Sequence, residues 1–137
     1  MTDKNTQVQL AKQPDGEPKI TDFKVEITER PRPSNGEFLV RNIYLSLDPY
    51  MRGAIAGRHM GHSKLSQGDV IGGRCVAQVM ESHNANYTEG EYLVMESGWQ
   101  SYAISNGNLK DEIRKLDPNL APLSTALGVL GMPGLTA

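Results

Sequence analysis

The stretch from residue 44 to residue 53 reads Y-L-S-L-D-P-Y-M-R-G, and it constrains this chain more than any other. The apolar run at residues 38–47 is rich in residues that suit a half-buried strand. Asp48-Pro49 then ends that strand, because proline lacks an N–H for the ladder and disfavours a helical conformation before it. The strand end should present three side chains at a rim, as the edge of a site or as a turn that caps the core. They are Tyr50, Met51 and Arg52.

The composition is that of a globular chain of 137 residues with a formal net charge of −2. The sequence has no basic footprint for nucleic acid and no apolar run of the roughly 18–20 residues that cross a bilayer. Residues 1–5 are polar and do not resemble a signal peptide. The single cysteine, Cys75, excludes an internal disulfide and suits a reducing compartment. We therefore expect a cytoplasmic protein that binds neither nucleic acid nor membranes.

Fourteen glycines and eight prolines separate many short apolar runs, a pattern typical of β structure with frequent turns. Residues 23–28 alternate apolar and polar side chains, which predicts a strand with one solvated face. Gly72 and Gly73 predict a bulge or a close approach of another group to the backbone. Together the runs predict a small antiparallel barrel or sandwich. Strands are expected at residues 8–11, 23–28, 38–47, 74–81, 92–95 and 99–104.

The rest of the chain is expected to be less regular. Residues 54–67 show little periodicity and are interpreted as a mobile loop over the rim. Residues 109–116 fit either an irregular strand or a turn of helix. Short helices are predicted to begin at Pro122 and Pro133. Because the second would have only four or five residues, too few to be stable alone, we interpret the chain as a fragment.

The sequence gives little support for a metal site or an activated nucleophile. His59 and His62 are close together, but the third histidine is distant and no Cys-x-x-Cys pair exists, so we expect no zinc. Cys75 falls in a predicted strand, where a buried, unreactive thiol is expected. Residues 128–134 are glycine-rich but lack the Lys-Ser/Thr of a phosphate-binding loop. Residue types alone thus predict a mainly β domain with a candidate site at the rim.

Two blocks of sequence, in this order, resemble the signatures of one family. The first is residues 44–53, and the second is residues 128–137, Gly-Val-Leu-Gly-Met-Pro-Gly-Leu-Thr-Ala. Weaker matches between them are Gly72-Gly73, residues 90–94 and residues 97–102. The chain resembles the zinc-independent medium-chain dehydrogenases/reductases, specifically the NADP-dependent alkenal/alkenone reductases. These include leukotriene B4 dehydrogenase/prostaglandin reductase and curcumin reductase-like proteins.

The resemblance implies a GroES-like, partly open barrel with a few short helices, which in such proteins accompanies a Rossmann-type nucleotide-binding domain. Residues 1–137 would then be the N-terminal catalytic and substrate domain, truncated at the junction to the nucleotide-binding domain. The missing domain would supply most of the NADP(H) surface and the contacts of a homodimer. We therefore expect the chain alone to have little or no activity.

The implied reaction is hydride transfer from NADPH to the β-carbon of an α,β-unsaturated ketone or aldehyde, then protonation of the α-carbon, without a metal. The developing enolate oxygen needs hydrogen-bond donors. Arg74 stands where some relatives have a pocket tyrosine, which alters the expected substrate preference. Arg52 is expected to hold Asp48 across the turn, and no catalytic residue is identified. The resemblance implies substrate binding by Tyr50 and Arg74, and cofactor binding by Pro49, Tyr50, Met132 and Thr136.

Another class of function stays open: a non-catalytic GroES-like module for interaction or oligomerisation. Such a module needs a mobile hydrophobic loop that docks a partner. Residues 54–67 supply only Ile55, Met60 and Leu65 as large apolar anchors for such a loop. A quinone reductase of the same superfamily is a third alternative, which the block at residues 44–53 disfavours.

Overall fold

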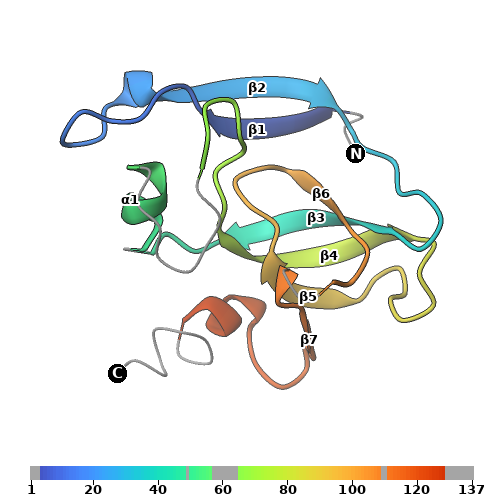
Figure 1. Cartoon of the computed structure of the whole chain (residues 1–137). Helices are drawn as coiled ribbons and strands as arrows, with labels where there is room; N and C mark the ends of the chain where they lie inside the picture. The colour runs from blue at the N-terminus through green and yellow to red at the C-terminus, as the bar shows by residue number, and fades with distance from the viewer. Residues whose placement is uncertain (1–3, 49, 57–64, 109–110, 129–137) are drawn as a thin grey trace.

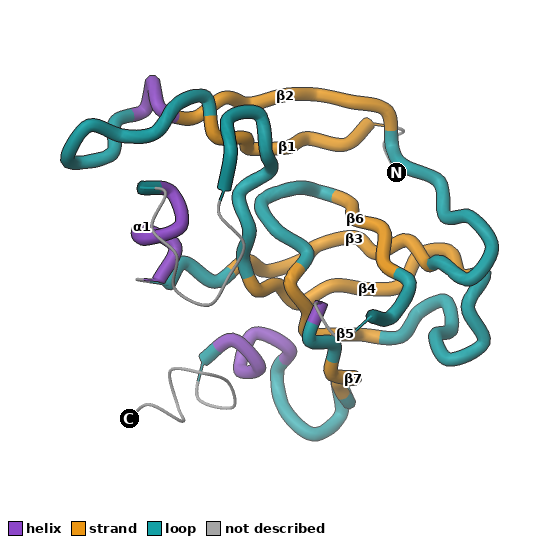
Figure 2. The backbone as a smooth tube through the Cα atoms, viewed as in Figure 1, coloured by secondary structure: helices purple, strands orange, loops and turns teal. Residues whose placement is uncertain are grey.

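A computed structural model describes residues 4–48, 50–56, 65–108 and 111–128, and only the backbone of Tyr50. This part of the chain is mainly β with short helices, as predicted (Figure 2). The strands are β1 (Lys4–Leu10), β2 (Phe23–Glu29), β3 (Phe38–Leu45), β4 (Arg74–Ser82), β5 (Tyr92–Glu96), β6 (Tyr102–Ser105) and β7 (Arg114–Leu116). The helices are the 3₁₀ turns η1 (Ile20–Asp22) and η3 (Leu123–Leu127) and the α-helix α1 (Tyr50–Ile55).

The strands form two antiparallel sheets, with the β1–β2 pair lying across the larger sheet (Figure 1). The larger sheet has the order β6-β3-β4-β5-β7. β3 pairs with β4 on one side and with β6 on the other. Its pairing with β4 is irregular between Asn42 and Tyr44, where one extra residue turns the end of the strand outward. Ile43, Tyr44 and Leu45 are consequently exposed.

The second edge of β1 joins the two sheets. The N–H of Val8 donates to the carbonyl of Trp99 at 2.8 Å, and the N–H of Leu10 donates to that of Asp69 at 2.9 Å. Ser101 in turn donates its N–H to the carbonyl of Thr6 at 3.0 Å. β1 therefore lies between β2 and two connecting segments, and the sheets close into a partly open barrel.

Three apolar clusters make up the core. The largest cluster consists of side chains of the five-stranded sheet and includes Phe38, Val79 and Leu93. A second joins β1 to the helix after β3 through Leu10, Ile55 and Ile71. The third places η3 on the other face of β4 and β5, and consists of Val76, Val94 and Ala126 with Leu116, Leu123 and Leu127 packed against it.

The outer half of β2 differs from what its alternating pattern predicted. Phe23 packs into the second cluster, but Val25 and Ile27 are each 65% exposed. β2 pairs only with β1 among the described residues, and this part of its apolar face has no described element over it. Alternation predicted the strand correctly, but it cannot show whether the apolar face is covered.

Two irregular regions are also better defined than expected. The first residues of the segment predicted as a loop, 54–67, continue α1 to Ile55. Pro122 does precede a helix, but this is the single 3₁₀ segment η3, which ends before Gly128. Residues 114–116 form the strand β7, and the second predicted helix, at Pro133, lies outside the described residues. Among the helices described, none has the length and apolar character needed to span a membrane.

Candidate functional site

The candidate site is the rim, which we define as residues 45–48 at the end of β3, residues 72–74 at the start of β4 and residues 96–99 after β5. The backbone holds these three segments together. Ser46 donates its N–H to the carbonyl of Arg74 at 2.9 Å, and Gly98 donates to that of Gly73 at 3.0 Å. The ends of three strands therefore meet at one edge of the barrel.

The strand ends before Asp48, as the sequence predicted, and the turn leads into α1, which was not predicted. The Ser46 hydroxyl donates to an Asp48 carboxylate oxygen at 3.0 Å. The Met51 N–H donates to the Asp48 carbonyl at 3.1 Å. Met51 itself is buried, with 5% of its surface exposed, so it belongs to the core and not to an exposed edge. The predicted presentation of Met51 at the rim is therefore wrong, because the start of α1 turns it inward.

Gly73 occupies the most crowded backbone position of the rim. A Cβ there would lie 2.9 Å from both Leu45 Cδ1 and Met51 Cε, and 3.2 Å from Trp99 Cδ1. A Cβ on Gly72 would meet nothing within 4 Å. The close approach predicted for the glycine pair is thus confirmed, and it falls on Gly73.

Arg74 is the predicted site residue whose side chain the structure describes. Its Nη1 donates to Oε2 of Glu112 at 3.2 Å, and its Nη2 donates to the carbonyl oxygen of the same residue at 3.1 Å. A guanidinium has five N–H groups in a fixed fork, so these contacts leave donors for a ligand. The side chain is 26% exposed, and it lies at the rim next to Gly73.

Sequence reasoning missed Glu112. It is 38 residues from Arg74, and no local pattern joins the two. Glu112 has φ 49°, in the left-handed region that costs a residue with a side chain on the order of 1 kcal/mol. Its contacts with Arg74 help to offset that cost.

Cys75 follows Arg74 and behaves as predicted for a buried thiol. It is fully buried, and its Sγ donates to the carbonyl of Gly98 at 3.4 Å. Burial raises the pKa of the thiol above its ordinary value of 9.0, and the negative charge of Glu96 raises it further. The thiol is therefore protonated at neutral pH and unsuited to nucleophilic attack.

Arg52 does not hold Asp48. Its Nη2 donates to the carbonyl of Gly16 instead, in the connection between β1 and β2. Its Nη1 is buried and has no hydrogen-bond partner among the described residues. Helix α1 directs this side chain to the connection between β1 and β2, which the expectation of a contact within the turn did not consider.

The remaining predicted site residues cannot be placed. Pro49, Met132 and Thr136 lie outside the described residues, as does the side chain of Tyr50. The histidine pair at residues 59 and 62 lies outside them as well. In the described part of the chain, no three His, Cys, Asp or Glu side chains gather in a way that could hold a metal ion.

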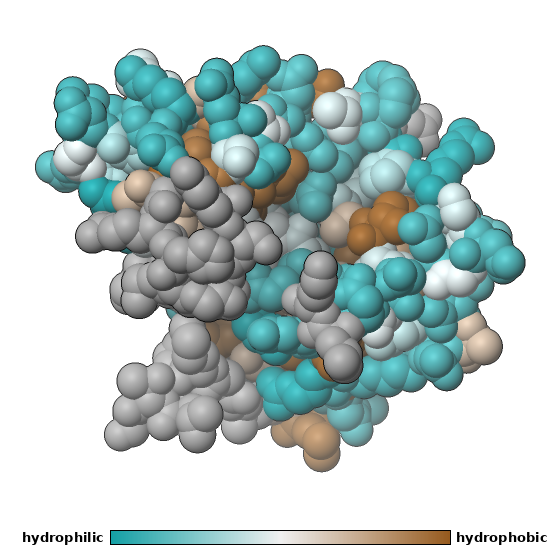
Figure 3. Space-filling model, in the orientation of Figure 1, coloured by the Kyte–Doolittle hydropathy of each residue, from teal (hydrophilic) through white to brown (hydrophobic). Residues whose placement is uncertain are grey.

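A groove of about 310 Å³ runs beside the rim, between β1 and the outward-turned end of β3. Its apolar walls are Val8, Ile43, Leu45 and Trp99. Trp99 stacks on Phe23 with ring centroids 6.2 Å apart, and its buried Nε1 has no partner among the described residues. Hydrophilic residues cover most of the face shown in Figure 3, and apolar residues gather beneath the β1–β2 pair.

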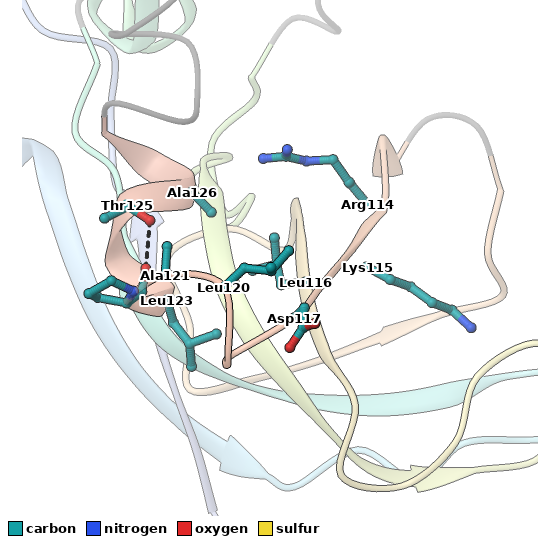
Figure 4. A pocket seen from close by; sticks show the side chains of 10 residues that line it. Arg114, Lys115, Leu116, Asp117, Leu120, Ala121, Leu123, Thr125 and Ala126 are labelled. Carbon is teal, nitrogen blue, oxygen red and sulfur yellow. Dashed lines mark hydrogen bonds between the residues drawn. The ribbon is translucent and has the colours of Figure 1, made fainter.

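A smaller hollow of about 150 Å³ lies away from the rim, between β7 and η3 (Figure 4). Leu116 and Leu120 lie side by side there, and Ala126 faces them from η3, whereas Lys115 points away. The Thr125 hydroxyl donates to the Pro122 carbonyl at 2.6 Å and fixes the start of η3. This hollow shares no residue with the rim.

The sequence matches one family model, described as the N-terminal domain of oxidoreductase, over residues 6–113. It is 40% identical over 122 residues to prostaglandin reductase 1 of Oryctolagus cuniculus, a match that covers 89% of this chain and 33% of that protein. It is 41% identical over 128 residues to the NADPH-dependent curcumin reductase of Escherichia coli (strain K12), which covers 93% of this chain and 36% of the relative.

Among solved structures, the chain resembles CurA of Vibrio vulnificus in complex with NADPH, with a TM-score of 0.85 and 39% identity. That match covers 96% of this chain and 38% of CurA. The predicted GroES-like fold is thereby confirmed. The chain spans between about a third and two-fifths of the length of these three proteins.

Proposed function

This chain belongs to the family of oxidoreductase N-terminal domains, and we propose that it forms the substrate-binding half of an NADPH-dependent reductase. The reaction is reduction of the C=C bond of α,β-unsaturated ketones and aldehydes. The proposal is supported by the similarity to NADPH-dependent curcumin reductase and to the NADPH complex of CurA. Because the chain matches only part of these proteins, the activity is proposed for the longer protein.

The observation that carries the proposal is the position of the Arg74 guanidinium at the rim. It has donors left for a ligand after its two contacts with Glu112. Exposed apolar side chains, Leu45 and Leu47, lie on the same rim, with 38% and 72% of their surface exposed. A rim that carries both a cation and apolar side chains suits an enone, whose carbonyl oxygen accepts hydrogen bonds and whose carbon skeleton is apolar.

Two features of the described rim support the proposal that it also contacts a flat cofactor ring. Gly72 has open space where a Cβ would be, and Leu47, also on the rim, offers an exposed apolar surface. When bound, NADPH would supply the hydride. From the family resemblance, we propose that Pro49, Tyr50, Met132 and Thr136 complete this surface.

The chain's own residues would act on the negative charge that develops on the substrate during the reaction. As the C=C bond is reduced, negative charge develops on the carbonyl oxygen, and donors fixed beforehand at that oxygen lower the barrier. Arg74 is such a donor, held in place by Glu112. Tyr50 is proposed as a second substrate contact, and Leu45 and Leu47 exclude water around the apolar part of the substrate.

The family resemblance further supports an arrangement for the whole protein. We propose that a nucleotide-binding domain accompanies this one, and that this other domain forms a homodimer. A cytoplasmic location agrees with the free, buried Cys75.

The proposal is tested with a longer form of the protein that spans the length of its relatives. We expect it to oxidise NADPH in the presence of an enone, and the 137-residue chain alone to be inactive. Arg74→Met should lower kcat/KM at least about tenfold, since a charged hydrogen bond contributes about 1.5–3 kcal/mol. Arg41→Met, which removes an exposed arginine of β3, is the matched control and should change little. A folded longer form that reduces no enone or enal would contradict the proposal.

A further inference from the structure

The contact between Arg74 and Glu112 uses both the side chain and the backbone of the glutamate. One guanidinium nitrogen meets the carboxylate at 3.2 Å, and the other meets the carbonyl oxygen at 3.1 Å. Two contacts to one residue fix the plane of the guanidinium, as a single flexible ion pair does not. Glu112 thus positions Arg74.

The same contact compensates the charge of Arg74. The side chain of Glu112 is 57% exposed, and one of its carboxylate oxygens lies 3.2 Å from a guanidinium that is always charged. Glu96 lies opposite Arg74 in the register of β4 and β5 and adds a second carboxylate.

We propose that Glu112 makes this site selective for neutral enones and enals over substrates that carry a carboxylate near the carbonyl group. Arg74 retains N–H donors for a neutral carbonyl oxygen. A substrate carboxylate would have to compete with Glu112 for the guanidinium and would be repelled by the Glu112 carboxylate. This inference rests on the proposed function and specifies its substrate class.

The backbone of Glu112 supports a positioning role. Its φ of 49° is the one positive φ at a residue other than glycine in the described part of the chain. A residue keeps such a strained conformation only where contacts with its surroundings hold it in place. The carbonyl that Arg74 meets belongs to this residue, so the left-handed conformation and the guanidinium contact support each other.

The test compares an enone that carries a carboxylate two methylene groups beyond its ketone with the methyl ester of the same compound. The methylene groups insulate the double bond, so intrinsic reactivity is nearly equal. In the longer form of the protein, Glu112→Gln should raise kcat/KM for the acid, relative to the ester, by about tenfold, equal to ~1.4 kcal/mol. Gln keeps the size of the side chain and removes its charge.

Two controls separate selectivity from general damage. The double variant Arg74→Gln/Glu112→Gln should lose the gain for the acid, because no guanidinium is left to bind it. Asp15→Asn removes an exposed carboxylate from the connection between β1 and β2 and should leave the ratio of acid to ester unchanged. An equal ratio in the parent protein and in Glu112→Gln would overturn the inference, since a purely structural role changes both substrates alike.

Binding of the saturated analogues, the keto acid and its methyl ester, distinguishes the two proposals. If neither unsaturated compound is reduced, the proposed function fails. The ratio of the two dissociation constants, measured by calorimetry, still shows whether Glu112→Gln favours the acid. A ratio that does not move contradicts the inference whatever the activity.

Discussion

Gly73 lies against Met51 so closely that a Cβ on the glycine would come within 2.9 Å of the methionine Cε. This contact joins the start of β4 to the first turn of α1. It explains why a glycine stands at this position of the rim. The space that a side chain would need is already filled by the core.

Gly73→Ala should therefore destabilise the chain. The neighbouring atoms are ends of flexible side chains, which can shift, so we expect a loss of about 1–3 kcal/mol in the free energy of unfolding. Gly72→Ala is the matched control, because its Cβ meets nothing within 4 Å, and it should be neutral or slightly stabilising. Urea unfolding followed by circular dichroism measures both. Equal stability of the two variants would show that the rim is not packed as described.

Asn42 should contribute more to stability than its partial exposure indicates. Its amide donates to the carbonyls of Gln100 at 2.8 Å and Gly98 at 3.2 Å, and its oxygen accepts from the Ser97 hydroxyl at 2.6 Å. Asn42→Ala leaves buried Ser97 without this acceptor and should cost about 1–3 kcal/mol.

The matched control for Asn42→Ala is Asn119→Ala, at an exposed turn, which should stay within about 0.5 kcal/mol of the parent. Emission of the single tryptophan, Trp99, follows the segment that Asn42 holds. An unchanged midpoint of urea unfolding in Asn42→Ala would contradict this role.

Cys75 should make stability depend on alkaline pH. The folded state raises the pKa of the thiol above its ordinary value of 9.0, so above that pH the unfolded chain loses a proton that the folded chain keeps. The free energy of unfolding should then fall with rising pH, by at most about 1.4 kcal/mol per pH unit for this one group. Below the ordinary pKa the stabilising effect is constant.

Cys75→Ala isolates this contribution, since all other titrating groups are shared. The difference in unfolding free energy between the parent and Cys75→Ala should be constant at neutral pH and shrink above pH 9.0. A thiol reagent should also label Cys75 slowly in the folded chain and rapidly in urea. Rapid labelling of the folded chain would show that the thiol is accessible.

Val25, on the exposed face of β2, can be compared with Val79, which is buried in β4. Val25→Thr should change the free energy of unfolding by less than about 0.5 kcal/mol, because Val25 is 65% exposed. Val79→Thr places a hydroxyl at a site with 1% exposure and should cost about 1–3 kcal/mol. A large loss in Val25→Thr would mean that another surface covers this strand, and light scattering would then detect the association.

Local chemistry made much of the fold predictable. The end of β3 before Asp48-Pro49 follows from the two residues themselves, and the burial of Cys75 follows from its place in an apolar strand. The need for a glycine near the start of β4 was predictable from the pair, but which of the two is crowded depends on Met51 and Trp99, far away in the sequence.

The parts that could not be predicted depend on contacts between distant segments. Arg52 meets Gly16, 36 residues away, because α1 lies against the connection between β1 and β2. Glu112 meets Arg74 because the chain after β6 passes the start of β4. The exposure of Val25 depends on whether another element packs over β2, and the alternation of apolar and polar residues does not predict that.

The central claim is that this chain is half of an NADPH-dependent active site, and calorimetry of NADPH binding tests it most directly. The titration compares the 137-residue chain with a form extended by about 200 residues, roughly one further domain. We predict tight binding by the longer form and weak or undetectable binding by the chain alone. Absence of binding by a folded longer form would contradict the claim and favour a non-catalytic interaction module.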